Sequence, residues 1–148
     1  MEPTPGSAGR GRLGQVSGGT GIVEGAYVDA SAVLSVAFEE PGYEAVDQRL
    51  RGFSRLWSSH LLEAELRAAY VRNNLIFEPR FITGIEWVAP VRPLSREIAA
   101  ALEVGYLRGS DLWHVAAALY QADDPREVTF VTMDNRQRAV AAALGFQT

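Results

Sequence analysis

The chain has 148 residues, 47% of them hydrophobic, and a formal net charge of -4, which allows one sizeable core and argues against a protein that coats nucleic acid. It contains no cysteine and no lysine, which excludes disulfides, thiolate metal sites, P-loops and Schiff-base chemistry. No apolar run is long enough to span a membrane and the first residues lack the apolar core of a signal peptide, so we expect a cytoplasmic protein.

Residues 1–24 are rich in glycine and proline and lack the apolar periodicity of a helix or a strand. Such a segment cannot bury enough apolar surface to offset the entropy that ordering costs, so we expect a disordered leader. Residues 25–148 are then expected to form a single domain.

From Gly25 onward, short apolar runs alternate with segments of helical period, a pattern typical of an α/β fold with a mainly parallel sheet. In chain order we predict a strand at 26–28, helices at 31–38 and 43–53, a strand at 56–57, a helix at 59–73, a strand at 85–91, a helix with Ser95 as its N-cap that ends at Gly105 or Gly109, a helix at 110–121, a strand at 128–132, a helix at 135–144 and a short strand from Phe146.

Two acidic residues follow predicted strands. Asp29 comes directly after the first strand, and Asp134 follows the strand at 128–132 in a similar way. Since ligands bind outside the carboxyl ends of the strands in open α/β sheets, both carboxylates are expected to face one crevice. Asp111 lies at the start of a helix, and Glu65 lies on the helix after the second strand, where it could project toward the same edge.

Each acid also has a structural explanation. An aspartate between a strand and a helix is a good N-cap, which suits Asp29, Asp134 and above all Asp111, and Asp134 with Gln137 fits a capping box. Glu65 alone would be a solvated helix residue. The four together favour a site for Mg²⁺ or Mn²⁺, because these ions take carboxylate oxygens while keeping several waters.

Four segments in this order and spacing resemble the PIN domains, and within them the VapC-type toxins of bacterial toxin–antitoxin pairs. The segments are 27–32, 59–69 around Glu65, 107–119 with Asp111 and His114, and 131–134 leading to 141–146. The resemblance implies a three-layer α/β/α sandwich and a metal-dependent endoribonuclease that hydrolyses RNA. It also implies a cognate antitoxin protein as partner and a homodimer. Between Asn73 and Ile85 the chain is too short for the second helix of the helical hairpin usual in these toxins.

On this reading Asp29, Glu65, Asp111 and Asp134 are the catalytic residues and the ligands of Mg²⁺ or Mn²⁺, which would activate water and neutralise the phosphate. Ser31, Thr132 and Asn135 are expected to support them by hydrogen bonds. His114, about one helical turn beyond Asp111, is expected to be packed or to support a ligand rather than act as a base.

Among the other polar and aromatic residues, His60 is expected at the surface, and the tryptophans are expected in the core: Trp57, Trp87 and Trp113. Arginines suit RNA because a guanidinium can pair with phosphate in two places, and the candidates are Arg49, Arg51, Arg55, Arg67 and Arg72.

Two alternatives differ in function. One is a catalytically inactive PIN-like binding module. The other is a phosphatase with an aspartyl nucleophile after the first strand. Such phosphatases resemble Asp-x-Asp and use a lysine, whereas Ser31 occupies the second position and the chain has no lysine.

Overall fold

The computed structural model describes residues 25–148, so the leader predicted at 1–24 lies outside the described residues. The described chain contains four strands: β1 (Gly25–Val28), β2 (Arg55–Ser59), β3 (Ile85–Val88) and β4 (Val128–Val131). It contains six α-helices: α2 (Ala30–Ala37), α3 (Tyr43–Arg51), α4 (Leu61–Arg72), α5 (Ser95–Val104), α6 (Gly109–Gln121) and α7 (Asn135–Ala143). Two 3-10 turns complete it: η2 (Pro79–Phe81) and η3 (Pro125–Glu127).

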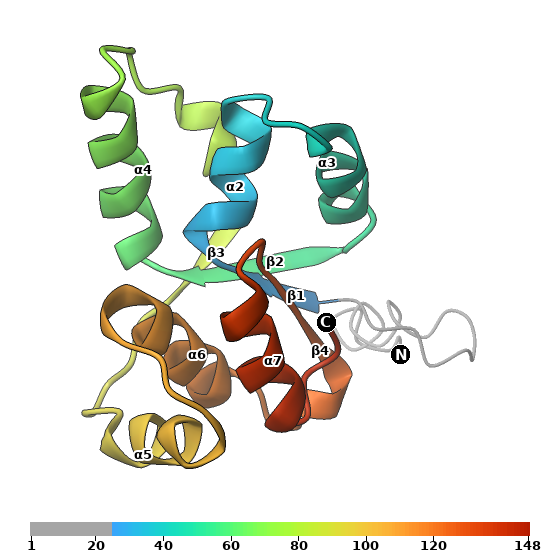
Figure 1. Ribbon diagram of the computed structural model, residues 1–148, viewed down its shortest axis with the longest axis vertical. Coiled ribbons are helices and arrows are strands. Elements are labelled where there is room, and N and C mark those ends of the chain that lie inside the picture. The colour runs from blue at the N-terminus through green and yellow to red at the C-terminus, as the bar shows by residue number, and fades with distance from the viewer. Residues whose placement is uncertain (1–24) are drawn as a thin grey trace, which may run out of the picture.

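The strands form one sheet in the order β3-β2-β1-β4, and every pair is parallel. Parallel neighbours need long crossover connections, which the helices supply, so helices cover both faces of the sheet. Figure 1 shows α2, α3 and α4 on one side of the sheet and α5, α6 and α7 on the other. This arrangement confirms the predicted three-layer α/β/α sandwich.

The central strand β1 is buried on both faces because a helical layer packs against each. Tyr27 joins the cluster formed with α6 and α7, whereas Ala26 and Val28 join the cluster formed with α2 and α4. Gly25 allows a close approach, since a Cβ at this position would lie 2.2 Å from the ring of Trp57. The site described below therefore stands on the most buried strand of the sheet.

Some of the predicted boundaries are wrong. β3 ends at Val88 instead of Val91, because Pro90 lacks the N–H that a ladder needs and Val91 is almost fully exposed. α5 is capped by Leu94 rather than Ser95, because the buried Leu94 provides the carbonyl that accepts the first helical hydrogen bond, from Ile98. The strand expected from Phe146 is a single parallel bridge between Thr129 and Gln147.

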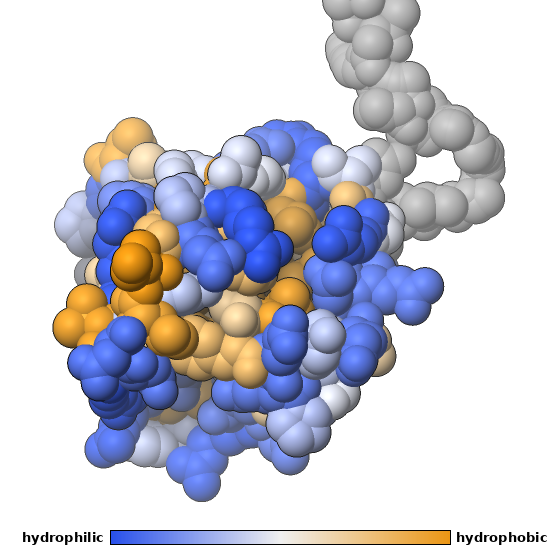
Figure 2. Space-filling view, turned by 90° about the horizontal axis from the view of Figure 1, so that it is seen from above, coloured by the Kyte–Doolittle hydropathy of each residue, from blue (hydrophilic) through white to orange (hydrophobic). Residues whose placement is uncertain are grey.

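Hydrophobic side chains are exposed at the end of α4 and just after it. Val71, Leu75 and Ile76 are each at least half exposed, and Figure 2 shows hydrophobic side chains gathered at this side of the molecule. In the described chain, η2 is the only helical turn between α4 and β3, as expected from the short segment between Asn73 and Ile85. None of the described helices is long and apolar enough to cross a membrane.

Candidate active site

The carboxyl ends of β1 and β4 lie side by side. Val28 is in register with Val131, and the N–H of Asp29 donates to the carbonyl of Val131 over 3.2 Å. Asp29 and Asp134 therefore leave the same edge of the sheet on adjacent loops, as the order of strand and acid in the sequence predicts.

Hydroxyl groups join these two loops. Ser31 Oγ donates to Asp29 Oδ1 over 2.8 Å and accepts from the N–H of Met133 over 2.9 Å. Thr132 Oγ1 lies 3.2 Å from Ser31 Oγ and accepts from the N–H of Asp134 over 3.0 Å. Because each of these groups is hydrogen-bonded, the two loops have fixed positions relative to each other.

Capping explains two of the aspartates in part. Asp29 accepts from the N–H of Ser31 and caps α2, and Asp134 accepts from the N–H of Gln137 and caps α7. Capping is wrong for Asp111, which lies in the first turn of α6 behind the N-cap residue Arg108 and whose carboxylate accepts no hydrogen bond from the described residues. The capping box is also only half present, because the side chain of Gln137 does not return to the Asp134 N–H.

Gln137 instead ties two site segments together. Its side chain is fully buried, donates from Nε2 to the carbonyl of Asp111 over 3.1 Å and accepts at Oε1 from the hydroxyl of Thr132 over 2.6 Å. The capping-box pattern predicts a different role for Gln137, a return to the N–H of Asp134. Its actual partners, Thr132 and Asp111, lie outside α7, so the sequence around Gln137 does not indicate them.

Asp111 and Asp134 share one pocket. Its volume is about 390 Å³, and it is lined by Asp111, Asp134 and the residues Tyr106, Leu107, Arg108, Asn135 and Arg136. Burial raises the pKa of Asp111, and the neighbouring carboxylates of Asp134 and Glu65 raise it further. Two of the other predicted acids therefore repel the carboxylate of Asp111, as expected where carboxylates cluster.

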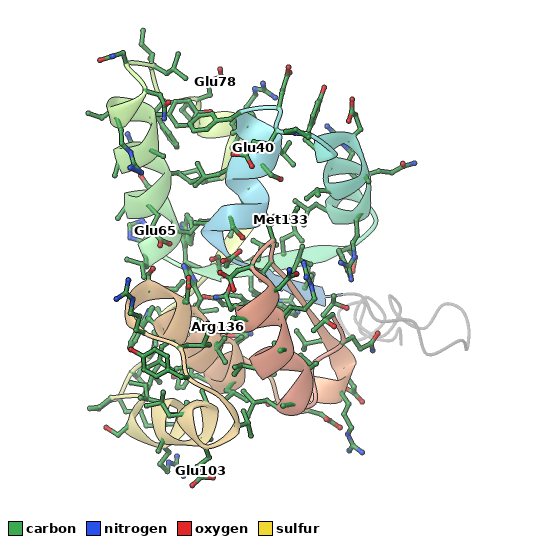
Figure 3. The ribbon with its side chains drawn as sticks, viewed as in Figure 1. Glu40, Glu65, Glu78, Glu103, Met133 and Arg136 are labelled. Carbon is green, nitrogen blue, oxygen red and sulfur yellow. The ribbon has the colours of Figure 1, made fainter. Side chains whose placement is uncertain are left out.

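Glu65 reaches this cluster from the opposite helical layer. Its Oε1 accepts a hydrogen bond of 2.7 Å from Nε2 of His114, and its side chain is 26% exposed. A merely solvated glutamate is therefore the wrong description of Glu65. Figure 3 shows Glu65 on the first half of α4 and Arg136 at the start of α7, on the two sides of the sheet.

His114 is buried, which confirms the expectation of a packed histidine. Its Nδ1 lies 2.7 Å from the hydroxyl of Tyr27. Burial raises the pKa of Asp29, and the hydrogen bond from Ser31 opposes that rise. His114 therefore contacts Glu65 on one side and Tyr27 on the other. Tyr27 was not predicted as a site residue, since a tyrosine in a buried strand carries no signal beyond packing.

The donor set suits a hard divalent cation, although the side chains do not form a complete cage. Within residues 25–148, no three aspartate, glutamate or histidine side chains stand close enough to hold one ion as they are placed. Mg²⁺, however, is commonly held by one or two carboxylates and keeps several waters. The pair Asp111 and Asp134, which lines one pocket, meets that smaller requirement.

The arginines expected to contact RNA are mostly engaged elsewhere. Arg51, Arg55 and Arg67 form ion pairs with Asp47, Glu86 and Glu63. The pocket is lined instead by Arg108 and Arg136, whose side chains form no hydrogen bond or ion pair with the described residues. Neither arginine was predicted, because only the packing of α6 against α7 brings them together.

The predictions for His60 and Asn135 and for the tryptophans have different outcomes. His60 is exposed, as predicted. Trp57 and Trp113 pack against the core, and Trp113 donates to the hydroxyl of Ser59, but Trp87 is 36% exposed on edge strand β3, so its assignment to the core is wrong. Asn135 lines the pocket and accepts a hydrogen bond from Arg138.

Comparison with protein families gives one match, to the model described as PIN domain, over residues 26–143. This range includes Asp29, Glu65, Asp111 and Asp134, and it begins one residue after the first described residue. Searches among curated proteins and among solved structures gave no match.

Proposed function

The chain belongs to the PIN-domain family, and from this premise we propose that it is a metal-dependent endoribonuclease that hydrolyses phosphodiester bonds in RNA. The PIN domain is generally a metal-dependent nuclease fold. The observation that carries the proposal for this chain is the pocket in which Asp111 and Asp134 lie beside two arginines that form no ion pair with the described residues.

Asp29, Glu65, Asp111 and Asp134 are the proposed ligands of Mg²⁺ or Mn²⁺, directly or through water. When bound, such an ion supplies an activated water, neutralises phosphate charge and assists the leaving oxygen. The repulsion of Asp111 by Asp134 and Glu65 supports this assignment, because a cation would relieve it. Ser31 and Thr132 contribute by keeping the loops of Asp29 and Asp134 in place.

Arg108 and Arg136 are the proposed contacts to the RNA backbone. A guanidinium without a protein partner is available for a phosphate oxygen, to which it can donate two parallel hydrogen bonds. Both arginines stand at the start of a helix, where a positive charge is unfavourable to the helix dipole unless an anion compensates it. A bound phosphate would be that anion.

Incubation of the purified protein with mixed structured RNAs, with Mg²⁺, with Mn²⁺ or with EDTA, tests the proposal. We expect cleavage only with metal, abolished in Asp29→Asn and Asp111→Asn and retained in Asp124→Asn. Asp124 is the matched control, because it caps η3, does not line the pocket and pairs with Arg126. Metal-dependent RNA binding without cleavage would favour the inactive binding module. Hydrolysis of a phosphomonoester with no cutting of RNA would favour the phosphatase.

We further propose that the ribonuclease is the toxin of a toxin–antitoxin pair, with a cognate antitoxin and a homodimeric state. The four segments that resemble VapC-type toxins support this role. Induction in a bacterial host should arrest growth, and Asp111→Asn should relieve the arrest. Light scattering measures the dimer, and a monomer at micromolar concentration would contradict it.

A further inference from the structure

A continuous line of hydrogen bonds runs from the core of the protein to Glu65. It starts at Tyr27 on β1, passes through His114 on α6 and ends at Glu65 on α4, and both links measure 2.7 Å. Tyr27 and His114 are each 1% exposed, whereas the Glu65 side chain is 26% exposed. The line therefore joins three elements and emerges at the carboxylate cluster.

The rings that carry this line are packed rigidly. The ring of Tyr27 is stacked on Phe130, with centroids 5.4 Å apart, and meets the imidazole of His114 edge-on at 5.7 Å. Because both rings are also enclosed by the core, neither can turn without opening a cavity or breaking a buried hydrogen bond.

In one arrangement of the protons, every donor in this line meets an acceptor. The N–H of Ser59 donates to the Tyr27 hydroxyl oxygen over 2.9 Å, and the single proton of that hydroxyl is free to be donated onward. Nδ1 of His114 lies at 2.7 Å to receive it. Since Nδ1 then carries no proton, Nε2 carries the proton of a neutral imidazole and donates it to Glu65 Oε1.

We propose that Tyr27 and His114 are positioning residues that hold Glu65 in one orientation through a neutral imidazole protonated at Nε2. Such a donor orients a carboxylate without placing a positive charge beside it, so it does not oppose a divalent cation as an imidazolium would. The value of this orientation for catalysis rests on the proposed function. The assignment of the proton does not.

Long-range ¹H–¹⁵N NMR of the ¹⁵N-labelled full chain reads the tautomer directly, without metal. The chain has two histidines, so the exposed His60 is an internal reference. We expect His114 to show one protonated nitrogen, Nε2, at neutral pH, and to lose this preference in Tyr27→Phe. An Nδ1–H tautomer would overturn the proposal. So would an imidazolium, in which the Tyr27 hydroxyl donates to another group such as the neighbouring hydroxyl of Ser58.

Titration calorimetry with Mn²⁺ then tests the positioning role. His114→Ala should weaken Mn²⁺ binding by roughly 10-fold to 100-fold, as loss of a partner to a metal ligand commonly does. His114→Gln should recover part of that loss, because its amide can still donate to Glu65. Equal affinities in wild type and His114→Ala would overturn the positioning role. Absence of Mn²⁺ binding in the wild type would overturn the proposed function and the positioning role with it, whereas a wrong tautomer would leave the proposed function standing.

Discussion

Gln137→Leu removes the buried amide that ties α7 to α6 and to the loop after β4. The native side chain makes two hydrogen bonds, to the carbonyl of Asp111 and from the hydroxyl of Thr132. Leucine has a similar volume, so the substitution removes the polar contacts without leaving a large cavity.

The expected loss in the free energy of unfolding depends on whether the former partners of Gln137 find other hydrogen bonds. A hydrogen bond contributes about 1 kcal/mol net, so two losses amount to about 2 kcal/mol. The penalty for unsatisfied groups is limited, because the carbonyl of Asp111 also belongs to the ladder of α6 and the hydroxyl of Thr132 can turn toward Ser31 Oγ, 3.2 Å away. For a domain of this size, about 2 kcal/mol lowers Tm by roughly 8 °C.

Urea and thermal unfolding of Gln137→Leu and Gln147→Leu measure this difference. Gln147 is the matched control, because it is exposed and its side chain donates to the carbonyl of Arg126 at the surface. We expect the control to lose less than about 0.5 kcal/mol. If the two variants lose the same stability, the buried amide does not hold α6 and α7 together as described.

Three further predictions concern charge, substrate and the leader. The raised pKa of Asp111 means that the native chain binds more protons than the unfolded chain in the carboxylate range. In EDTA, the free energy of unfolding of Asp111→Asn should therefore rise relative to that of wild type as the pH increases from about 4 to 7, which denaturation measures. A difference between the two proteins that does not change with pH would contradict the repulsion. Arg136→Ala should raise the KM for RNA about tenfold, while Arg126→Ala, at an exposed arginine that pairs with Asp124 outside the pocket, leaves it unchanged. Equal effects in steady-state kinetics would remove Arg136 from the substrate site. A chain that starts at Gly25 should match the full chain in Tm and cleavage rate, and a large fall in Tm would show that residues 1–24 belong to the domain.

Local pattern was enough for much of the fold. The apolar run before Asp29 and the alternation of strands with helices predict a parallel sheet, and the parallel sheet places Asp29 and Asp134 at one edge. Boundaries were less accurate. The start of α5 depends on the burial of Leu94, a tertiary contact that outweighs the local preference of Ser95 for a cap.

The candidate site shows the same division. The resemblance predicts that Asp111 lies near Asp134. By contrast, only the backbone of the preceding turn shows that Asp111 does not cap α6. Gly109 begins α6 with a φ of 56°, a left-handed conformation that glycine adopts readily, and the helix therefore starts before Asp111.

The amino-acid sequence by itself determined the order of strands and helices and the acids that follow the strands, because periodicity and turn chemistry act between residues close in the chain. Only the tertiary structure decided that Glu65 bonds to His114, that His114 meets Tyr27, and that Arg108 and Arg136 share a pocket with Asp111 and Asp134. Tyr27 and His114 are 87 positions apart, and Glu65 and His114 are 49 apart. Contacts over such separations depend on how two helical layers pack against one sheet. The residues next to a side chain in the sequence do not indicate that packing.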